Sequence, residues 1–220
     1  MIVTLYDYNA GTDNMLTIAV QAGGESRRMG RDKAWMPFLG QPLVLRIVAR
    51  VAPAADEWFV VTNRPEPYAR LGIPLAADIR PGRGALGGLY TALSAARHDD
   101  VAAVGCDMPF VNAALLIHQR DVLMRGGVDA VVPITDQGFE PFHAVYRRDA
   151  CLEAVQAALD AGEWRATSWL DRVRVYRLSS EEARRHDPQG LAFRNANTIE
   201  EFQATETTAR ELEQPPSPRA

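Results

Sequence analysis

The chain has 220 residues and a mass of 24.2 kDa, the size of one domain or of two small ones. Hydrophobic residues make up 47% and charged residues 24% of the sequence, which is typical of a folded globular protein and excludes wholesale disorder. A net charge of -4 argues against a binder of duplex nucleic acid, because such proteins usually carry a basic surface.

Targeting and redox signals are also missing from the sequence. No apolar run reaches the ~20 residues that cross a bilayer, and residues 1–14 lack the basic and apolar regions of a secretory signal. The two cysteines, Cys106 and Cys151, are too few for a disulfide framework. We therefore expect a cytoplasmic protein that contacts neither membrane nor nucleic acid.

Short β-branched runs alternate with amphipathic stretches along the chain. In chain order we expect strand 17–22, helix 42–51, strand 58–62, helix 86–97, strand 101–105, helix 112–125, strands 130–134 and 142–146, helix 151–161, strand 173–176 and helix 198–204. This alternation predicts an α/β fold with a mainly parallel central sheet flanked by helices. We expect residues 1–14 to form an irregular arm, 15–204 a single domain and the proline-containing end, 205–220, a disordered tail.

The first predicted strand ends in a stretch rich in glycine and basic residues, from Gln21 to Lys33. Ligands of open parallel sheets bind outside the carboxyl ends of the strands, where small residues let backbone N–H groups approach an anion. Arg27 and Lys33 add positive charge suited to phosphate oxygens. A phosphate-binding loop explains this combination better than an ordinary solvated turn. It is not a Walker loop, because Ala34 stands where Ser or Thr would bind magnesium, and it lacks the dinucleotide pattern G-x-G-x-x-G.

The same stretch resembles the nucleotidyltransferase loop of the molybdenum cofactor guanylyltransferase (MobA-like) family, Leu-Ala-Gly-Gly-x-Ser-x-Arg-Met-Gly-x-Asp-Lys. Residues 22–33 match this signature throughout, and Gln21 alone departs from it by replacing the leucine. The resemblance extends from Leu16 to Phe202. It implies a single-domain, Rossmann-like nucleotidyltransferase fold and a reaction that uses MgGTP.

Further residues fit this family after the other predicted strands. Asp107 in Cys106-Asp107-Met108-Pro109 matches the family's magnesium ligand, and a carboxylate at the end of a strand suits that hard cation. Asn63 and Asp78 match positions that contact the nucleoside, although Asn63 is equally suited to a turn. A carboxylate can accept hydrogen bonds from the ring N–H and the exocyclic amine of guanine together, which gives Asp78 a chemical role.

The acceptor side is marked less clearly. Asn195 and Asn197 match the family's Asn-x-Asn-Thr element, in which Thr198 is also a helix cap. His143 lies on an alternating strand and is better explained as a packed residue than as a ligand or base. Trp164 and Trp169 would either stack on a pterin ring or, by the better explanation, pack in the core.

The resemblance thus implies transfer of GMP from MgGTP to the molybdopterin form of the molybdenum cofactor, with release of pyrophosphate. Arg27, Lys33 and Asp107 would be catalytic, Asp107 would hold Mg²⁺, and Asn195 and Asn197 would face the acceptor. The nucleotide would be bound by Gln21, Ala22, Gly23, Gly24, Lys33, Asn63, Asp78 and Asp107. No nucleophilic side chain has an adjacent base, so we expect no covalent enzyme intermediate.

Other functions remain open at this point. A cytidylyltransferase of the same cofactor, or a sugar-phosphate nucleotidyltransferase, would differ at Gln21 and in the loop from Gly82 to Gly88. A non-catalytic nucleotide or cofactor-binding adaptor is a further alternative. We expect a monomer that makes transient contact with cofactor-inserting proteins or recipient molybdoenzymes.

Overall fold

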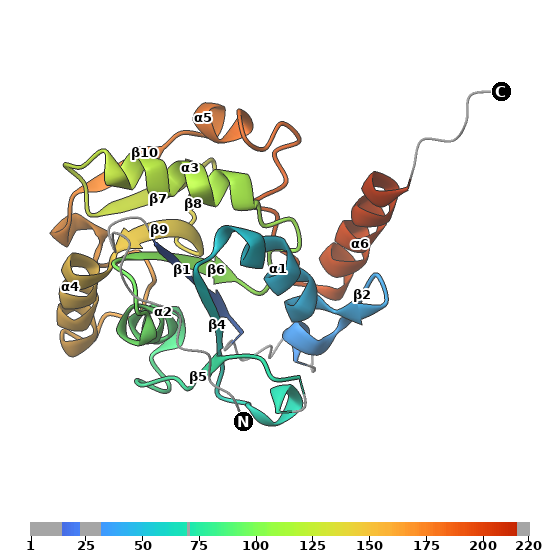
Figure 1. Ribbon diagram of the computed structural model, residues 1–220, viewed down its shortest axis with the longest axis horizontal. Coiled ribbons are helices and arrows are strands. Elements are labelled where there is room, and N and C mark those ends of the chain that lie inside the picture. The colour runs from blue at the N-terminus through green and yellow to red at the C-terminus, as the bar shows by residue number, and fades with distance from the viewer. Residues whose placement is uncertain (1–14, 23–31, 70, 215–220) are drawn as a thin grey trace, which may run out of the picture.

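The computed structural model describes residues 15–22, 32–69 and 71–214. A central sheet runs through these ranges in the order β10-β7-β9-β6-β1-β4-β5, with β8 paired to the end of β7 (Figure 1). The sheet strands are β1 (Leu16–Gln21), β4 (Glu57–Val61), β5 (Leu75–Ala76), β6 (Asp100–Gly105), β7 (Ala130–Thr135), β8 (Gly138–Phe139), β9 (His143–Arg147) and β10 (Val175–Leu178). A separate hairpin pairs β2 (Pro37–Phe38) with β3 (Gln41–Pro42).

The sheet is mostly parallel, as predicted. Strand β1 pairs in parallel with β4 on one side and with β6 on the other, and β5 and β10 also join in parallel. Strand β9 runs against both β6 and β7. Because the chain leaves β1 toward β4 and later returns to its other side at β6, the sheet has its switch point beside the carboxyl end of β1, where such sheets bind ligands.

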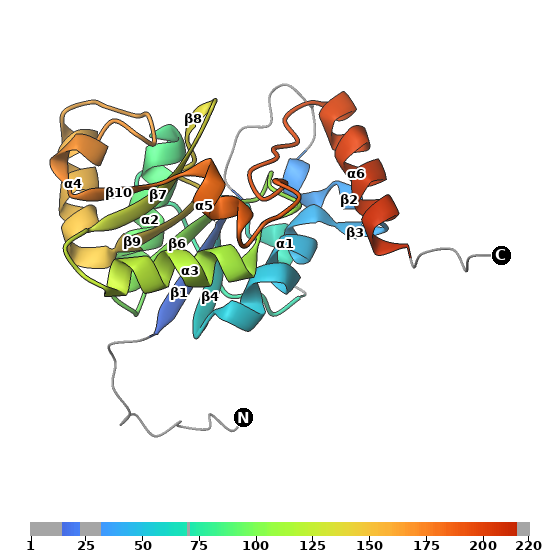
Figure 2. The same ribbon diagram turned by 90° about the horizontal axis from the view of Figure 1, so that it is seen from above.

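Helices cover both faces of the sheet (Figures 1 and 2). They are α1 (Leu43–Val51), α2 (Gly84–Ala95), α3 (Ala113–Met124), α4 (Arg148–Asp160), α5 (Ser180–Arg184) and α6 (Ile199–Glu213). Helices α1 and α3 pack with Ile18 and Val20 of β1, whereas α2 and α4 pack with Val101 and Ala103 of β6. This division follows from the alternation of side chains along a strand, which gives each buried strand two apolar faces.

The predicted strands and helices are all present, with boundaries that differ by a few residues. The main correction concerns the end of the chain, because α6 continues to Glu213 and the predicted disordered tail is wrong for residues 205–213. Helix α6 is anchored by the edge-to-face contact of Phe202 with Phe38 and by Leu39 N–H donating to Glu206 Oε1 at 2.7 Å. The predicted arm, 1–14, and residues 215–220 lie outside the described residues.

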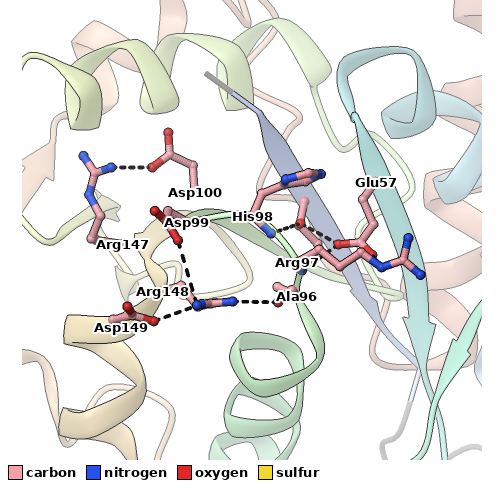
Figure 3. A network of polar contacts seen from close by, with 10 residues as sticks. Glu57, Ala96, Arg97, His98, Asp99, Asp100, Arg147, Arg148 and Asp149 are labelled. Carbon is pink, nitrogen blue, oxygen red and sulfur yellow. Dashed lines mark hydrogen bonds and ion pairs between the residues drawn. The ribbon is translucent and has the colours of Figure 1, made fainter. Parts of the chain in front are cut away.

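At the amino ends of the parallel strands, polar contacts link charged side chains of neighbouring strands and of α4 (Figure 3). Arg147 donates to the buried Asp100 carboxylate at 2.9 Å, and Arg148 reaches the Ala96 carbonyl and Asp99. This network lies at the edge of the sheet opposite the carboxyl ends of the parallel strands. No helix in the described ranges is long and apolar enough to span a membrane.

Candidate functional site

Three predicted residues from distant parts of the sequence meet at the carboxyl edge of the sheet. Lys33 begins a short 3-10 helix (Lys33–Trp35), whose first turn is capped by Asp32 Oδ1 accepting from Ala34 N–H at 3.1 Å. The Lys33 Nζ donates to Asn197 Oδ1 at 2.9 Å and lies 3.7 Å from Asp107 Oδ2. Lys33 is only 8% exposed, so its ammonium group is held in one place and faces the carboxylate at short range.

Asp107 follows the end of β6 and lies close to its own backbone. A Cβ at Gly105 would lie 2.5 Å from Asp107 Oδ1, so that position requires glycine for the carboxylate to fold back over the strand. The Asp107 carbonyl accepts from Ala196 N–H at 3.0 Å, which holds the segment with Asn195 and Asn197 against the loop. The Asp107 side chain is about one-third exposed and can reach a ligand.

Asn63 and Asp78 form a second pair at the same edge of the sheet, after β4 and β5. Asp78 N–H donates to Asn63 Oδ1 at 3.1 Å, and Asn63 Nδ2 lies 3.5 Å from Asp78 Oδ2. The other carboxylate oxygen, Oδ1, accepts from Arg80 N–H at 3.0 Å and from the Thr91 hydroxyl at 3.1 Å. The carboxylate is therefore fixed on one side, and among the described residues its Oδ2 has a single long contact. The pair joins the segments that follow β4 and β5, a contact that was not predicted from the sequence.

Gln21 ends β1 and turns toward α2. Its Nε2 donates to the Gly88 carbonyl at 2.9 Å. A Cβ at Gly88 would lie 2.3 Å from Gln21 Oε1, so the amide lies directly against this glycine. The next residue, Ala22, is buried and donates its N–H to Val61 O at 2.9 Å, which continues β1 to the start of the predicted phosphate loop.

Three predicted site residues cannot be placed. Gly23, Gly24 and Arg27 fall in the range 23–31, outside the described residues. The two flanks of the predicted loop are both described, because Ala22 ends one side and Asp32 begins the other. The candidate site is therefore described through Gln21, Ala22, Lys33, Asn63, Asp78, Asp107, Asn195 and Asn197.

The acceptor-side residues differ in their surroundings. Asn197 is exposed and contacts Lys33, whereas Asn195 Oδ1 is buried with no hydrogen-bond partner among the described residues. Such an atom is costly to leave unpaired, so Asn195 is a candidate to meet a ligand. His143 is a packed residue, as predicted: it is fully buried, and its Nε2 accepts from Asn112 N–H at 3.2 Å. Burial lowers the pKa of His143 to about 4.

The other aromatic and sulfur side chains have distinct roles. Trp169 is fully buried and donates its indole N–H to Ala166 O at 2.8 Å, which confirms core packing for this residue. Trp164 is about half exposed, and the Cζ of Arg83 lies 5.4 Å from the centre of the Trp164 ring. The core explanation is therefore wrong for Trp164.

The Cys106 thiol is not a reactive group. Desolvation and the adjacent Asp107 carboxylate raise the pKa of this thiol to about 12, which leaves it without thiolate reactivity near neutral pH.

Two contributors to the site were not predicted from the sequence. Thr91 supports Asp78 from the second turn of α2, and Gly88 receives Gln21. The unusual run of glycines at residues 84, 87 and 88 was the available signal, because glycine is costly inside a helix unless close approach requires it.

Comparison with known proteins identifies the family of this chain. Residues 18–175 match the model of the MobA-like NTP transferase domain. This chain belongs to that family. A probable molybdenum cofactor guanylyltransferase from Peptoclostridium acidaminophilum is 34% identical over 188 residues, which cover 83% of this chain and 85% of the relative. A molybdenum cofactor guanylyltransferase from Desulfosudis oleivorans is 32% identical, with 89% of this chain and 96% of the relative covered.

Solved structures show the same MobA-like architecture. The molybdopterin-guanine dinucleotide biosynthesis protein A from Archaeoglobus fulgidus superposes with a TM-score of 0.79 and 25% identity, over 89% of this chain and 99% of that one. A nucleotidyl transferase from Methanothermobacter thermautotrophicus shares the fold with a TM-score of 0.67 at 18% identity, over 91% of this chain and 100% of that one. The predicted Rossmann-like nucleotidyltransferase fold is confirmed.

Proposed function

We propose that this MobA-like protein transfers GMP from GTP to the molybdopterin form of the molybdenum cofactor and releases pyrophosphate. The observation that carries the proposal is the meeting of Lys33, Asp107 and Asn197 at the carboxyl edge of the sheet, where the Asn63–Asp78 pair also lies. The names of the relatives at 32–34% identity support the choice of guanine nucleotide and of acceptor.

In this mechanism, a terminal phosphate oxygen of the acceptor attacks the α-phosphorus of GTP in line, and the bond to the pyrophosphate oxygen breaks. Such transfers depend on positioning and on neutralisation of charge more than on covalent help from the protein. Lys33 is preorganised by Asn197 and would stabilise negative charge that develops on the phosphates. Arg27 and the backbone of residues 22–24 would hold the triphosphate.

The nucleoside would bind beside β4 and β5. Asp78 Oδ2 and Asn63 supply the acceptor and amide groups there, and guanine offers a ring N–H and an exocyclic amine as adjacent donors. Asn195, whose Oδ1 is buried without a described partner, would face the acceptor together with Asn197. Contacts with cofactor-inserting proteins or recipient molybdoenzymes are part of the proposal, since the product must be passed on.

The donor set at Asp107 fits Mg²⁺. This cation prefers one or two carboxylates together with substrate phosphates and water, and Asp107 offers a partly exposed carboxylate next to Lys33. Within the described residues, no group of three or more His, Cys, Asp or Glu side chains is arranged to hold a metal ion. Asp107 would hold Mg²⁺, which would supply neutralisation of phosphate charge.

A panel of nucleotides tests the proposal. Thermal unfolding would be followed with Mg²⁺ and equal concentrations of GTP, CTP, ATP or UTP. A ligand at 100 times its Kd stabilises the folded state by about 2.7 kcal/mol, a shift of several degrees, and we expect it with GTP. Selective stabilisation by CTP would favour the cytidylyltransferase alternative, and the absence of any shift would contradict nucleotide binding. Tight GTP binding without pyrophosphate release would favour an adaptor.

The magnesium role has its own test. Asp107→Asn keeps the shape of the side chain and removes the charge that would hold the cation, so we expect Mg²⁺-dependent turnover to be lost while the unfolding temperature changes little. Turnover of GTP would be measured against Mg²⁺ concentration. An unchanged magnesium dependence in the variant would remove Asp107 from that role.

A further inference from the structure

Two consecutive glycines of α2 lie against two different acceptor groups of the candidate nucleotide site. A Cβ at Gly87 would lie 3.7 Å from Asp78 Oδ1, and one at Gly88 would lie 2.3 Å from Gln21 Oε1. Gly87 is further enclosed by the Arg80 carbonyl, 2.8 Å from the same built Cβ. The first turns of α2 therefore bring the Asp78 carboxylate and the Gln21 amide to adjacent positions on one helix.

The Gln21 amide is oriented by its own contact. Because Nε2 donates to the Gly88 carbonyl at 2.9 Å, the acceptor Oε1 is fixed beside it. Within the described ranges no donor reaches Gln21 Oε1, and the side chain is partly exposed at the end of β1. An oriented acceptor is thus available next to the carboxylate that is assigned to the nucleobase. The leucine of the family signature has no such group.

We propose that Gln21 determines base specificity by accepting a hydrogen bond from the 2-amino group of guanine. This inference rests on the proposed function, in which Asp78 accepts from the ring N–H and from one hydrogen of that amine. The amine has a second hydrogen, and Gln21 Oε1 is the acceptor for it. Hypoxanthine has the same ring N–H and lacks the amine, so Gln21 makes the site discriminate GTP from inosine triphosphate.

The test compares the affinities of GTP and inosine triphosphate for the wild type and for Gln21→Leu. Leucine has a similar volume and is the family residue, so the variant is expected to fold. Loss of one neutral hydrogen bond in a site costs about a factor of 5 to 10 in affinity. We expect the Kd for GTP to rise by that factor and the Kd for inosine triphosphate to stay within about twofold. Gln156→Leu, on the exposed side of α4, is the matched control and should alter neither value.

A second variant tests the role of the glycine. Gly88→Ala places a methyl group where the Gln21 amide lies, so it should lower the preference for GTP although Gln21 is still present. In the double variant the effects should not add, because both changes remove the same contact. If Gly88→Ala does not fold, the affinities of Gln21→Leu for GTP and inosine triphosphate alone test the proposal.

The outcomes separate this inference from the function on which it rests. A wild-type protein that binds GTP no better than CTP would overturn the proposed function. A wild type that selects GTP, together with a Gln21→Leu variant whose ratio of affinities for GTP and inosine triphosphate is unchanged, would overturn the role of Gln21 alone. Additive effects of Gln21→Leu and Gly88→Ala on this ratio of affinities would also contradict the proposed role of Gln21.

Discussion

Lys33 is the only lysine among the 24 lysine and arginine residues of the chain. All the other residues of this set are arginines, whereas a lysine is present at the position where the side chain contacts Asn197 and faces Asp107. The two side chains differ physically, because an ammonium group is a compact point charge and a guanidinium is a wide planar fork. Lys33 is only 8% exposed, and such close surroundings suit the compact group.

Replacement of Lys33 by alanine should lower turnover by a factor of about 10² or more, since it removes a preorganised charge from the reacting phosphates. Steady-state pyrophosphate release is the measurement. Lys33→Arg is the matched control for charge, and we expect it to restore only part of the rate because its fork does not fit the same space. A near-normal rate in Lys33→Ala would exclude Lys33 from the mechanism.

Individual site residues differ in how far the sequence predicts them. Lys33 and Asp107 are part of motifs that follow predicted strands, so their shared edge of the sheet could be predicted, whereas Asp78 was placed only by the family resemblance. The contacts of Thr91 with Asp78 and of Gly88 with Gln21 depend on how closely α2 approaches the sheet. That distance is set by tertiary packing, which local sequence patterns do not determine.

Among the elements, β6 and β9 are joined at the amino end of β6 by an ion pair whose carboxylate is buried and whose arginine is partly exposed. Asp100 is 2% exposed, and its Oδ1 accepts from Arg147 Nη1 at 2.9 Å. Burial raises the pKa of Asp100, while Arg147 acts in the opposite direction. Arg147 also reaches the Leu123 carbonyl at the end of α3, at 3.4 Å, so one side chain ties two strands and a helix.

Arg147→Met should lower the free energy of unfolding by about 3 kcal/mol at neutral pH, because it leaves a buried carboxylate without its partner. Urea denaturation would give the value. Arg97→Met is the matched control: Arg97 pairs with Glu57 at 3.2 Å but is 84% exposed, and such a pair contributes about 0–1 kcal/mol. Equal losses in the two variants would contradict the importance of burial at Asp100.

Helix α6 is an element whose length the sequence pattern did not predict. Its start is well marked, since Thr198 Oγ1 accepts from Glu201 N–H and Glu201 returns a contact to the Thr198 N–H. The length of the helix is poorly marked, because only Phe202, Thr205 and Ala209 are buried and most of the other residues are polar or charged. The contacts of α6 with the β2–β3 hairpin stabilise a helix that composition alone indicates as a tail.

For the molecule as a whole, His143 links folding to pH. Its folded pKa is about 4 because of burial, whereas an unfolded histidine has a pKa of about 6.5. Between these two pKa values the unfolded chain binds more protons than the folded chain, so the free energy of unfolding falls as the pH decreases from about 6.5 to about 4. Below about pH 4 this contribution no longer changes with pH. The loss from this one group amounts to about 3 kcal/mol.

His143→Gln should remove most of that dependence, since glutamine keeps an acceptor for Asn112 N–H and does not titrate. The measurement is the free energy of unfolding from pH 7 to pH 4, compared as a slope so that any constant loss of stability cancels. His98→Gln, at the opposite edge of the sheet, serves as control. An identical slope in His143→Gln and wild type would show that His143 does not carry the effect.

The fold was more predictable than the site. Buried runs such as those at β1 and β6 indicate central strands from composition alone, and their alternation with helices predicts the parallel sheet. The short strands β2, β3, β5 and β8 have two residues each and carry no periodic signal. Strands β2, β3 and β8 form by pairing across short turns, and β5 forms by joining β4 in parallel, so each depends on a pairing that two residues do not indicate.

Transfer of the nucleotide can be followed directly with GTP labelled at either the α- or the γ-phosphate. The protein would be incubated with Mg²⁺, molybdopterin cofactor and each labelled GTP. We expect the α-label to appear in the modified cofactor and the γ-label in pyrophosphate, and both products to form more slowly by a factor of about 10² or more in Lys33→Ala. Release of the γ-label as free phosphate, or an α-label that never reaches the cofactor, would contradict guanylyl transfer.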